Sequence, residues 1–359
     1  MSHRITILDV ARAARVSPST VSRALTGQNY RLSQGTRDRI VRLAAQMGYS
    51  PNPIARGLAT GVTDAVGIVV PGLRNPYPLE FVEQAEKHIA RLGYETWLLF
   101  CHNDRQLMEA RLRTLLAHRV RGILFTPADF CDRPMPFYHQ LLDQFHSTLP
   151  VVLFNERFDS RNRFVVNGAN FDGAIQAVEY LLRLGHRRIA FLAGAMANSS
   201  LRDRYQGYRT TLMRHNIPFD EALVLTHIWC QDMTYDFAPI RAVLDLPDPP
   251  TAIFSCSDFI ALAVMRFLKD GGWRIPDDIS VMGFDNIELC NYLAEPLTSV
   301  GFSLDEMAAQ AVQILQDFWA SDGNICARDI CIPARLFIRK STALNKMMTI
   351  RKQWPAFLV

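Results

Sequence analysis

Residues 6–25 read TILDVARAARVSPSTVSRAL, and this stretch decides how the N-terminal part of the chain folds. Its first half repeats apolar residues at the spacing of one face of a short helix: Ile7, Val10, Ala11 and Ala14. Thr6 precedes this face as an N-cap. Ser17 and Pro18 indicate the start of a second helix, because serine caps helices and proline is favoured at the first helical position. The stretch therefore predicts two short helices joined by a tight turn.

The second predicted helix separates apolar from polar side chains. Its inward face is Val21, Ala24 and Leu25, and its outward face is Ser19, Thr20, Ser22 and Arg23. A third helix begins near Thr36, ends at the stop signal Gly48 and has one apolar face: Ile40, Leu43, Ala44 and Met47. Two short helices closed by a third make a helix-turn-helix unit, in which the second helix enters the major groove of DNA.

Positive charge is concentrated in this N-terminal part. Residues 1–63 contain nine arginines and no lysine against Asp9 and Asp38, which is +7 in a chain of +4, so the remainder carries −3. A basic head on a mildly acidic body favours a polyanionic partner for the head. The hydroxyl groups of Ser19 and Thr20 suit bases or phosphates, and Arg23 suits a guanine edge. A three-helix domain without a ligand would show the same apolar pattern, but it would not need this charge.

Residues 6–25 closely resemble the DNA-binding domain of the lactose/galactose repressor family, and residues 48–58, GYSPNPIARGL, resemble its hinge helix. The segment Ile54–Thr60 is too short to be a stable helix alone, so it is expected to order on DNA. The resemblance implies that Leu58 wedges into a minor-groove step and kinks the duplex, the alternative being an ordinary linker hydrophobe. Residue types and resemblance together predict these DNA-binding residues: Thr6, Ser17, Pro18, Ser19, Thr20, Ser22, Arg23, Asn29, Arg56 and Leu58.

From Ala65 onward, short apolar runs alternate with longer amphipathic stretches. The runs, each typical of a buried strand, are Val66–Val70, Trp97–Phe100, Ile123–Thr126, Val151–Phe154, Ile189–Ala193, Val224–Ile228, Ala252–Cys256 and Ser280–Phe284. The helical stretches between them include Glu80–Leu92, Leu107–Ala117, Ala174–Leu184 and Ile260–Asp270. This βαβ alternation predicts parallel sheets covered by helices on both faces. Two similar series, beginning at Val66 and Ile189, predict two lobes with a ligand cleft beyond the carboxyl ends of the strands.

The body also resembles the effector domain of the same family, which is like a periplasmic sugar-binding protein. The phrases that carry this resemblance are GHRRI at residues 185–189, VMGFDN at 281–286 and PLTSV at 296–300. The expected fold is an all-α helix-turn-helix head plus an α/β body of two doubly wound parallel-sheet lobes. The expected domains are the head at 1–50, the hinge and linker at 51–63, the effector-binding and dimerisation body at 64–342, and a C-terminal tail at 343–359.

The resemblance implies an effector site at the strand ends, formed by Asn75, Tyr77, Asn155, Ser200, Arg204, Trp229, Asp285 and Asn286. The guanidinium fork of Arg204 suits hydroxyl pairs or a carboxylate, and Trp229 suits the face of a ring. Each assignment has a structural alternative. Arg204 and Asp285 would pair with each other across the cleft, Trp229 would belong to the core, and Asn155 would serve a turn. Asp258 is assigned first to a helix N-terminus.

Enzyme and metal motifs are absent from the sequence. It has no GxSxG, HExxH, Walker A or GxGxxG pattern, and its seven cysteines form no CxxC pair, so we expect no catalysis, cofactor or metal. No stretch approaches roughly 18 apolar residues, and residues 1–5 lack the apolar region of a signal peptide. The expected location is the cytoplasm, on the nucleoid when bound to DNA. Solute binding and enzymatic use of the same cleft are the alternatives from other functional classes.

The sequence therefore predicts a DNA-binding transcription regulator, a repressor, that binds a near-palindromic operator as a homodimer. The resemblance favours a sugar, a sugar acid or a related metabolite as the effector that controls it. The tail at 343–359 lacks the heptad leucines of a tetramerising coiled coil, so a dimer is expected.

Overall fold

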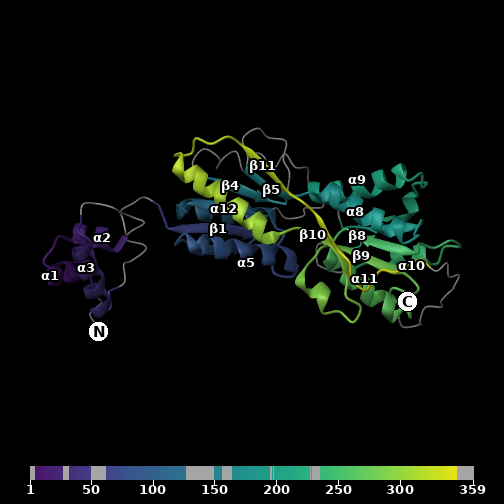
Figure 1. Cartoon of the computed structure of the whole chain (residues 1–359), viewed down its shortest axis with the longest axis horizontal. Coiled ribbons are helices and arrows are strands. Elements are labelled where there is room, and N and C mark those ends of the chain that lie inside the picture. Colours follow the sequence, from purple (N-terminus) through teal and green to yellow (C-terminus); the bar gives the residue numbers. More distant parts are fainter. Residues whose placement is uncertain are drawn as a thin grey trace. The chain divides into compact units, whose positions relative to one another are not determined.

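The computed structural model of the chain describes residues 5–26, 32–49, 62–126, 149–155, 164–194, 196, 198–226, 228 and 235–345. The chain divides into two compact units, Met1–Asp64 and Ala65–Val359, which are described separately below (Figure 1). None of the helices in these ranges is long and apolar enough to cross a membrane.

In the described part of the first unit, three helices pack around a small core. They are α1 (Ile7–Ala14), α2 (Pro18–Thr26) and α3 (Gln34–Gln46). The buried residues all come from the predicted inward faces: Val10, Ala11, Ala14, Val21, Ala24, Ile40 and Ala44. The other residues of those faces are only partly buried and pack against this core: Ile7, Leu25, Leu43 and Met47. The turn between α1 and α2 begins with Arg15 in the left-handed conformation (φ 52°). Helix α3 starts two residues earlier than expected, because Ser33 caps it by accepting a hydrogen bond from the Thr36 N–H.

The second unit contains two lobes, each built on a six-stranded sheet. The N-terminal lobe contains β1 (Ala65–Val70), α5 (Pro76–Arg91), β2 (Glu95–Phe100), α6 (Arg105–Ala117), β3 (Gly122–Phe125), β4 (Val151–Phe154), β5 (Phe164–Gly168), α12 (Leu304–Ala320) and β11 (Arg328–Ile332). The C-terminal lobe contains α8 (Asn170–Arg183), β6 (Ile189–Leu192), α9 (Ser199–Arg214), η1 (Glu221–Leu223), β7 (Val224–Leu225), α10 (Ala238–Leu244), β8 (Ala252–Ser255), α11 (Asp258–Asp270), β9 (Ser280–Asp285), η2 (Glu288–Asn291), β10 (Thr298–Gly301) and β12 (Arg335–Phe337).

Both sheets are doubly wound, as predicted. The strand orders are β2-β1-β3-β4-β5-β11 and β7-β6-β8-β9-β10-β12. All neighbouring strands run parallel except β10 and β12, which are antiparallel. The chain passes between the lobes three times, after β5, β10 and β11, so the last third of the sequence supplies α12 and β11 to the N-terminal lobe (Figure 1).

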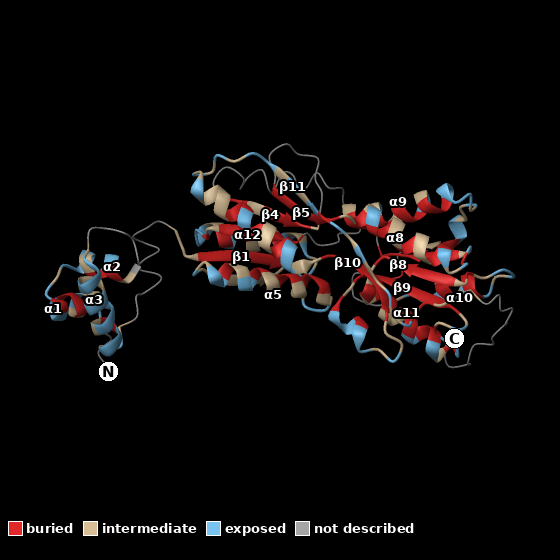
Figure 2. Cartoon of the chain, in the orientation of Figure 1, coloured by how far each residue is buried: buried red, intermediate tan, exposed pale blue. Residues whose placement is uncertain are grey.

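Strand β1 shows why these apolar runs are buried in the middle of a sheet. Val66, Ile68 and Val70 point into the large cluster that includes α5 and α12, whereas Ala65 and Val69 point into the smaller cluster beneath α6. A strand with both faces covered has no polar side, so its run is continuously apolar. Figure 2 shows the same pattern in the central strands of both lobes, which are buried along their length.

The predicted strands lie where expected to within a few residues. One predicted strand and the C-terminal end of the body differ from expectation in their extent. The run Val224–Ile228 forms a strand only at Val224–Leu225. Residues 343–345 belong to the hydrogen-bonded body, because the Ala343 N–H donates to Ser280 Oγ (3.1 Å) and the Asn345 N–H donates to the Leu184 carbonyl (2.8 Å). The packed body thus continues to Asn345, three residues beyond its expected end at residue 342.

Candidate functional site

In the head unit, helix α2 and Ser17 directly before it carry six of the ten predicted DNA-binding residues, and Thr6 directly precedes α1. Thr6, Ser17, Pro18, Ser19, Ser22 and Arg23 are exposed and Thr20 is half-buried. Val21 and Ala24 occupy the opposite, buried side of the same helix. Asn29, Arg56 and Leu58 lie outside the described residues. The helix therefore has an exposed side that can contact a macromolecule and a buried side that holds it to α1 and α3.

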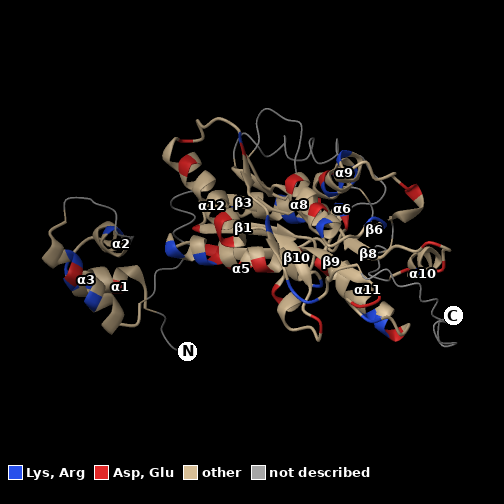
Figure 3. Cartoon of the chain, turned by 45° about the vertical axis from the view of Figure 1, so that its right-hand side comes forward, with Lys and Arg blue, Asp and Glu red and all other residues tan. Residues whose placement is uncertain are grey.

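The exposed N-terminus of α2 carries three hydroxyl groups in contact. Ser17 Oγ lies 2.7 Å from Ser19 Oγ and 2.8 Å from Thr20 Oγ1, and it accepts a hydrogen bond from the Thr20 N–H (3.2 Å). A helix N-terminus has a partial positive charge and attracts phosphate groups. Helix α2 carries Arg23 in its last turn, and helix α3 carries Arg37, Arg39 and Arg42; Figure 3 colours basic residues of both helices blue. The surface offers both phosphate contacts and donors for base edges.

In the body, the centre of the C-terminal lobe edge is a buried ion pair. Arg204 of α9 and Asp285 at the end of β9 are 3% and 4% exposed, with Nη1 2.9 Å from Oδ1. Arg204 also donates from Nε to Asn170 Oδ1 (2.8 Å) and from Nη1 to the Cys256 carbonyl, and its guanidinium lies 3.9 Å from the Phe284 ring centre. The pairing considered in the sequence is present, but both residues belong to one lobe rather than to opposite sides of a cleft.

Arg204 keeps one nitrogen available. Nε and Nη1 are engaged as described, and no residue in the described part of the chain accepts a hydrogen bond from Nη2. A ligand carboxylate that accepts hydrogen bonds from two guanidinium nitrogens would have to displace Asp285 or Asn170. Nη2 alone suits one hydroxyl or carbonyl oxygen.

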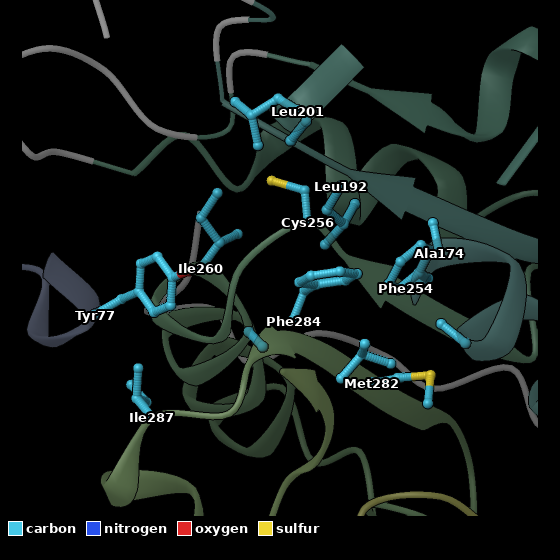
Figure 4. Close-up of a cluster of buried hydrophobic side chains, with 14 of the residues drawn as sticks. Tyr77, Ala174, Leu192, Leu201, Phe254, Cys256, Ile260, Met282, Phe284 and Ile287 are labelled. Carbon is cyan, nitrogen blue, oxygen red and sulfur yellow. The ribbon is translucent and has the colours of Figure 1, made fainter. Parts of the chain in front are cut away.

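The N-terminal lobe contributes two buried hydroxyl groups at the carboxyl edge of its sheet. Tyr77 Oη near the start of α5 and Thr126 Oγ1 after β3 have no hydrogen-bond partner among the described residues. Burial raises the pKa of Tyr77, the Asp285 carboxylate raises it further, and Arg204 opposes both. Tyr77 belongs to the same buried cluster as Phe284, the residue that precedes Asp285 in β9. Figure 4 shows Tyr77 in one buried cluster with Ile260 and Ile287 of the C-terminal lobe.

Asn155 joins the two lobes. Its carbonyl accepts a hydrogen bond from Ser200 Oγ (2.6 Å), and its Oδ1 accepts a longer one from Asn170 Nδ2 (3.4 Å). Asn155 has a positive φ of 58°, a conformation that asparagine tolerates better than most residues. It therefore serves a turn, as its alternative assignment holds, and at the same time contacts Ser200, a second predicted site residue.

Three other predicted site residues lie in different surroundings. Asn75 caps α5, with its Oδ1 accepting from the Tyr77 N–H (3.1 Å). Asn286 Oδ1 accepts from Arg339 Nη2 (2.7 Å), so this side-chain oxygen is engaged away from Arg204. Trp229 lies outside the described residues. The structure thus brings together Tyr77, Arg204 and Asp285, and links Asn155 to Ser200.

The sequence analysis did not identify Thr126 or Asn170 as site residues, and it assigned Asp258 only to a helix N-terminus. Thr126 has the place of the last residue in an apolar run, and Asn170 follows β5, a strand that was not predicted. Asp258 is the first residue of α11, but it is fully buried and accepts hydrogen bonds from three donors. Burial first and the Asp285 carboxylate second raise the pKa of Asp258 to about 7, against the opposing effect of those hydrogen bonds. Its position shortly after β8, at a carboxyl strand end, is the signal in the sequence that could have found it.

Comparisons with known families follow the same division of the chain. Residues 6–52 match the family described as "Bacterial regulatory proteins, lacI family". Residues 178–342 match the family described as "Periplasmic binding protein-like domain". The first match contains the three helices of the head, and the second contains most of the C-terminal lobe.

Full-length relatives combine both parts. The chain is 30% identical over 338 residues to the HTH-type transcriptional repressor PurR of Haemophilus influenzae (strain PittEE), covering 94% of this chain and 98% of that protein. Its fold is similar to the Lac repressor dimer bound to operator and the anti-inducer ONPF (TM-score 0.76, 25% identity, 95% of this chain and 100% of that one). It is also similar to the regulator CelR in complex with cellobiose (TM-score 0.67, 28% identity, 94% and 100% covered).

Proposed function

The chain belongs to the LacI family of bacterial regulatory proteins and is a DNA-binding transcription regulator, and we propose that it represses transcription from a near-palindromic operator under the control of a small polar effector. The observation that carries the DNA part is helix α2, whose predicted base-reading residues are exposed while Val21 and Ala24 hold it in the core. Such a head places the second helix of the unit in the major groove.

Selection from random DNA duplexes tests the head, because the selected duplexes themselves define the operator sequence. The wild-type protein is expected to recover a near-palindromic sequence. Arg23→Ala is expected to lower affinity for that sequence by about 10- to 150-fold, the effect of losing a bidentate base contact, and to change non-specific affinity by at most about threefold. Arg12→Ala is the matched control, because Arg12 is an exposed arginine of α1 rather than of α2. Equal losses on the selected and random DNA would contradict Arg23 as a base reader.

The effector part of the proposal rests on Tyr77, Arg204 and Asp285. The buried phenol of Tyr77, whose hydroxyl has no hydrogen-bond partner among the described residues, interacts electrostatically with the Arg204–Asp285 ion pair of the other lobe. Buried polar groups of this kind are normally hydrogen-bonded, and a ligand with hydroxyl or carbonyl groups would satisfy them. The complex of CelR with cellobiose supports a sugar as the class of effector.

A thermal-shift screen tests this site with sugars, sugar acids, sugar phosphates and nucleobases as probes. A probe that binds the folded state stabilises it by RT ln(1 + L/Kd), where L is the free probe concentration, and so raises the melting temperature. Tyr77→Phe is expected to reduce that shift, whereas Tyr208→Phe, whose hydroxyl donates to the Ile189 carbonyl inside the C-terminal lobe, is expected to retain it. A shift that survives both Tyr77→Phe and Arg204→Met would place the effector elsewhere.

We also propose that the working form is a homodimer in the cytoplasm. The Lac repressor is bound to its operator as a dimer, and a near-palindromic site requires a two-fold protein. The proposal expects a molecular mass of two chains by light scattering, and a monomer that binds the selected operator with full affinity would contradict it. The named relatives are repressors rather than enzymes, so we propose regulation without turnover of the bound molecule.

A further inference from the structure

Residues 285–288, here called the 285–288 loop, are held by four separate parts of the body. The Asp285 carboxylate pairs with Arg204 of α9, and Asn286 Oδ1 accepts from Arg339. The Ile287 N–H donates to Asp258 Oδ2 (2.9 Å), and the Glu288 N–H donates to Glu80 Oε1 (2.9 Å) on α5 of the N-terminal lobe. One loop thus carries a candidate effector contact at its first residue and a lobe-to-lobe hydrogen bond at its last.

The backbone of this loop needs such anchors. Asp285 has a φ of 111° and Asn286 a φ of 53°, both in the positive range that side-chain-bearing residues seldom adopt. Conformations of this kind persist only where the surroundings hold them. The loop's shape therefore depends on its hydrogen bonds more than on its own preferences.

Asp258 is the anchor that controls two consecutive amides of the loop. Its Oδ2 accepts directly from the Ile287 N–H and from Cys290 Sγ (3.2 Å). Its Oδ1 accepts from Ser299 Oγ (2.6 Å), and Ser299 Oγ in turn accepts from the Asn286 N–H (3.1 Å). A side chain at this position satisfies all these donors only if both of its oxygens accept hydrogen bonds.

The neighbouring glycines show how closely the backbone approaches this carboxylate. A Cβ on Gly283 would overlap Asp258 Oδ1, and a Cβ on Gly301 would overlap Asn286 and the Asp285 carbonyl. Strands β9 and β10 thus leave space for the carboxylate and for the loop. Asp258 is more than a helix N-terminal residue, because it is packed as part of the loop's support.

We propose that Asp258 is a positioning residue that fixes the 285–288 loop, and thereby sets both the Asp285 carboxylate at the candidate effector site and the Glu288–Glu80 hydrogen bond between the lobes. The inference rests on the proposed effector site for its functional meaning. An effector that moves Asp285 would reach the lobe contact through three residues of backbone. Two states of this short loop are then enough to link ligand binding with the arrangement of the lobes.

Amide hydrogen exchange of the full chain, resolved to single residues, tests this without any effector. Asp258→Asn keeps the size of the side chain but places an NH2 group where one set of donors needs an acceptor. It is expected to accelerate exchange of the Asn286 and Ile287 amides at least tenfold while leaving the interior of α11 unchanged. Ser257→Ala is the matched control, since Ser257 caps the same helix through the Ile260 N–H without touching the loop. It is expected to affect Ile260 and leave the loop amides as in wild type.

Two further variants each remove one of the hydrogen bonds that hold the loop. Ser299→Ala removes only the Asn286 arm and is expected to accelerate that amide most, whereas Glu80→Ala is expected to accelerate Glu288 alone. The proposal is overturned if Asp258→Asn raises exchange evenly across β8, β9 and β10, or if Ser257→Ala reproduces its pattern. If Asp258→Asn does not fold, Ser299→Ala decides, and an unchanged Asn286 amide overturns the proposal. A failed effector screen leaves these exchange results intact, so the two failures are distinguishable.

Discussion

The two lobes are built on the same sheet order but differ in the chemistry of their carboxyl edges. Strands β4 and β9 occupy equivalent fourth positions, and a positive-φ residue lies at the end of each: Asn155 after β4 and Asp285 in β9. In the C-terminal lobe the residue at this position, Asp285, is charged and forms an ion pair with Arg204. In the N-terminal lobe the polar atoms are neutral, and among the described residues the Tyr77 and Thr126 hydroxyl groups have no partner.

This difference separates two tasks within one site. In the C-terminal edge the buried charges of Arg204 and Asp285 pair with each other, so each side chain holds the other in place in the free protein. The N-terminal edge keeps hydroxyl groups that a ligand would satisfy. Substitutions in the C-terminal edge should therefore change mainly stability, and substitutions in the N-terminal edge should change mainly ligand binding.

The largest effect is expected from Arg204→Met. The substitution leaves the buried Asp285 carboxylate without its guanidinium, and removing one partner of a buried pair costs about 3–5 kcal/mol of the free energy of unfolding. Urea unfolding of the body measures it. The double variant Arg204→Met/Asp285→Asn is expected to lose less than the single one, because no unpaired buried charge remains. A double variant that is less stable than Arg204→Met would show that the pair itself, rather than the stranded charge, carries the energy.

The second effect concerns pH and again belongs to the C-terminal edge. Because burial and Asp285 raise the pKa of Asp258 from 3.8 to about 7, the folded protein retains a proton that the unfolded chain has released. Its contribution to stability is therefore complete below about pH 4 and is lost as the pH rises through about 7, at up to about 1.4 kcal/mol per pH unit. Melting temperatures from pH 5 to 8 should decline less steeply in Asp258→Asn than in wild type or Ser257→Ala. Parallel curves for all three proteins would contradict this assignment.

The sequence predicted eight of the strands from their continuous apolar runs, which are typical of strands covered on both faces. Strands β5 and β10 are also buried along their length, but they were not predicted. Val66–Val70 and Ile253–Phe254 are apolar whichever way they point, so their runs identify them before any tertiary contact is known. Strand β11 escaped prediction because it lies at the sheet edge, where Asp329 and Cys331 are exposed between less exposed neighbours. The three points at which the chain crosses between the lobes were not predicted for a different reason, because no local sequence pattern indicates which sheet a strand joins.

Helix α9 shows the limit for the site. Its buried face includes Leu201, Tyr208 and also Arg204, whose charge interrupts the apolar period that identifies a helix. The ion pair, together with hydrogen bonds to Asn170 and Cys256, makes the buried arginine tolerable, and that pair forms with a residue 81 positions later in the sequence. Family resemblance supplied Arg204 and Asp285 as site residues, whereas Asn170 and Thr126 required the three-dimensional strand ends.

The third prediction compares two buried tyrosines. Tyr208 donates its hydroxyl hydrogen to the Ile189 carbonyl (2.8 Å), whereas the hydroxyl of Tyr77 has no partner within the described ranges. Tyr208→Phe is expected to lower the free energy of unfolding by about 1 kcal/mol. Tyr77→Phe is expected to leave it unchanged or raise it by up to about 1 kcal/mol, because it removes an unsatisfied polar group from the interior. Urea unfolding compares the two directly, and a larger loss for Tyr77→Phe would reveal a partner for its hydroxyl in the free protein.

The smallest effects are expected where the two edges meet. Ser200→Ala removes the hydroxyl that reaches the Asn155 carbonyl, and Glu80→Gln weakens the acceptor of the Glu288 N–H, each at about 0.5–1.5 kcal/mol or less. If both hydrogen bonds stabilise one arrangement of the lobes, the loss of either bond lets the lobes separate. The remaining bond then no longer contributes to the free energy of unfolding. The double variant should then lose less than the sum of the single losses, which a double-mutant cycle in urea measures. Ser200→Ala combined with Tyr208→Phe, which acts within one lobe, should be additive. Strict additivity in the first cycle would mean that the lobes respond to each contact independently, and that the C-terminal edge does not transmit its geometry to the N-terminal one.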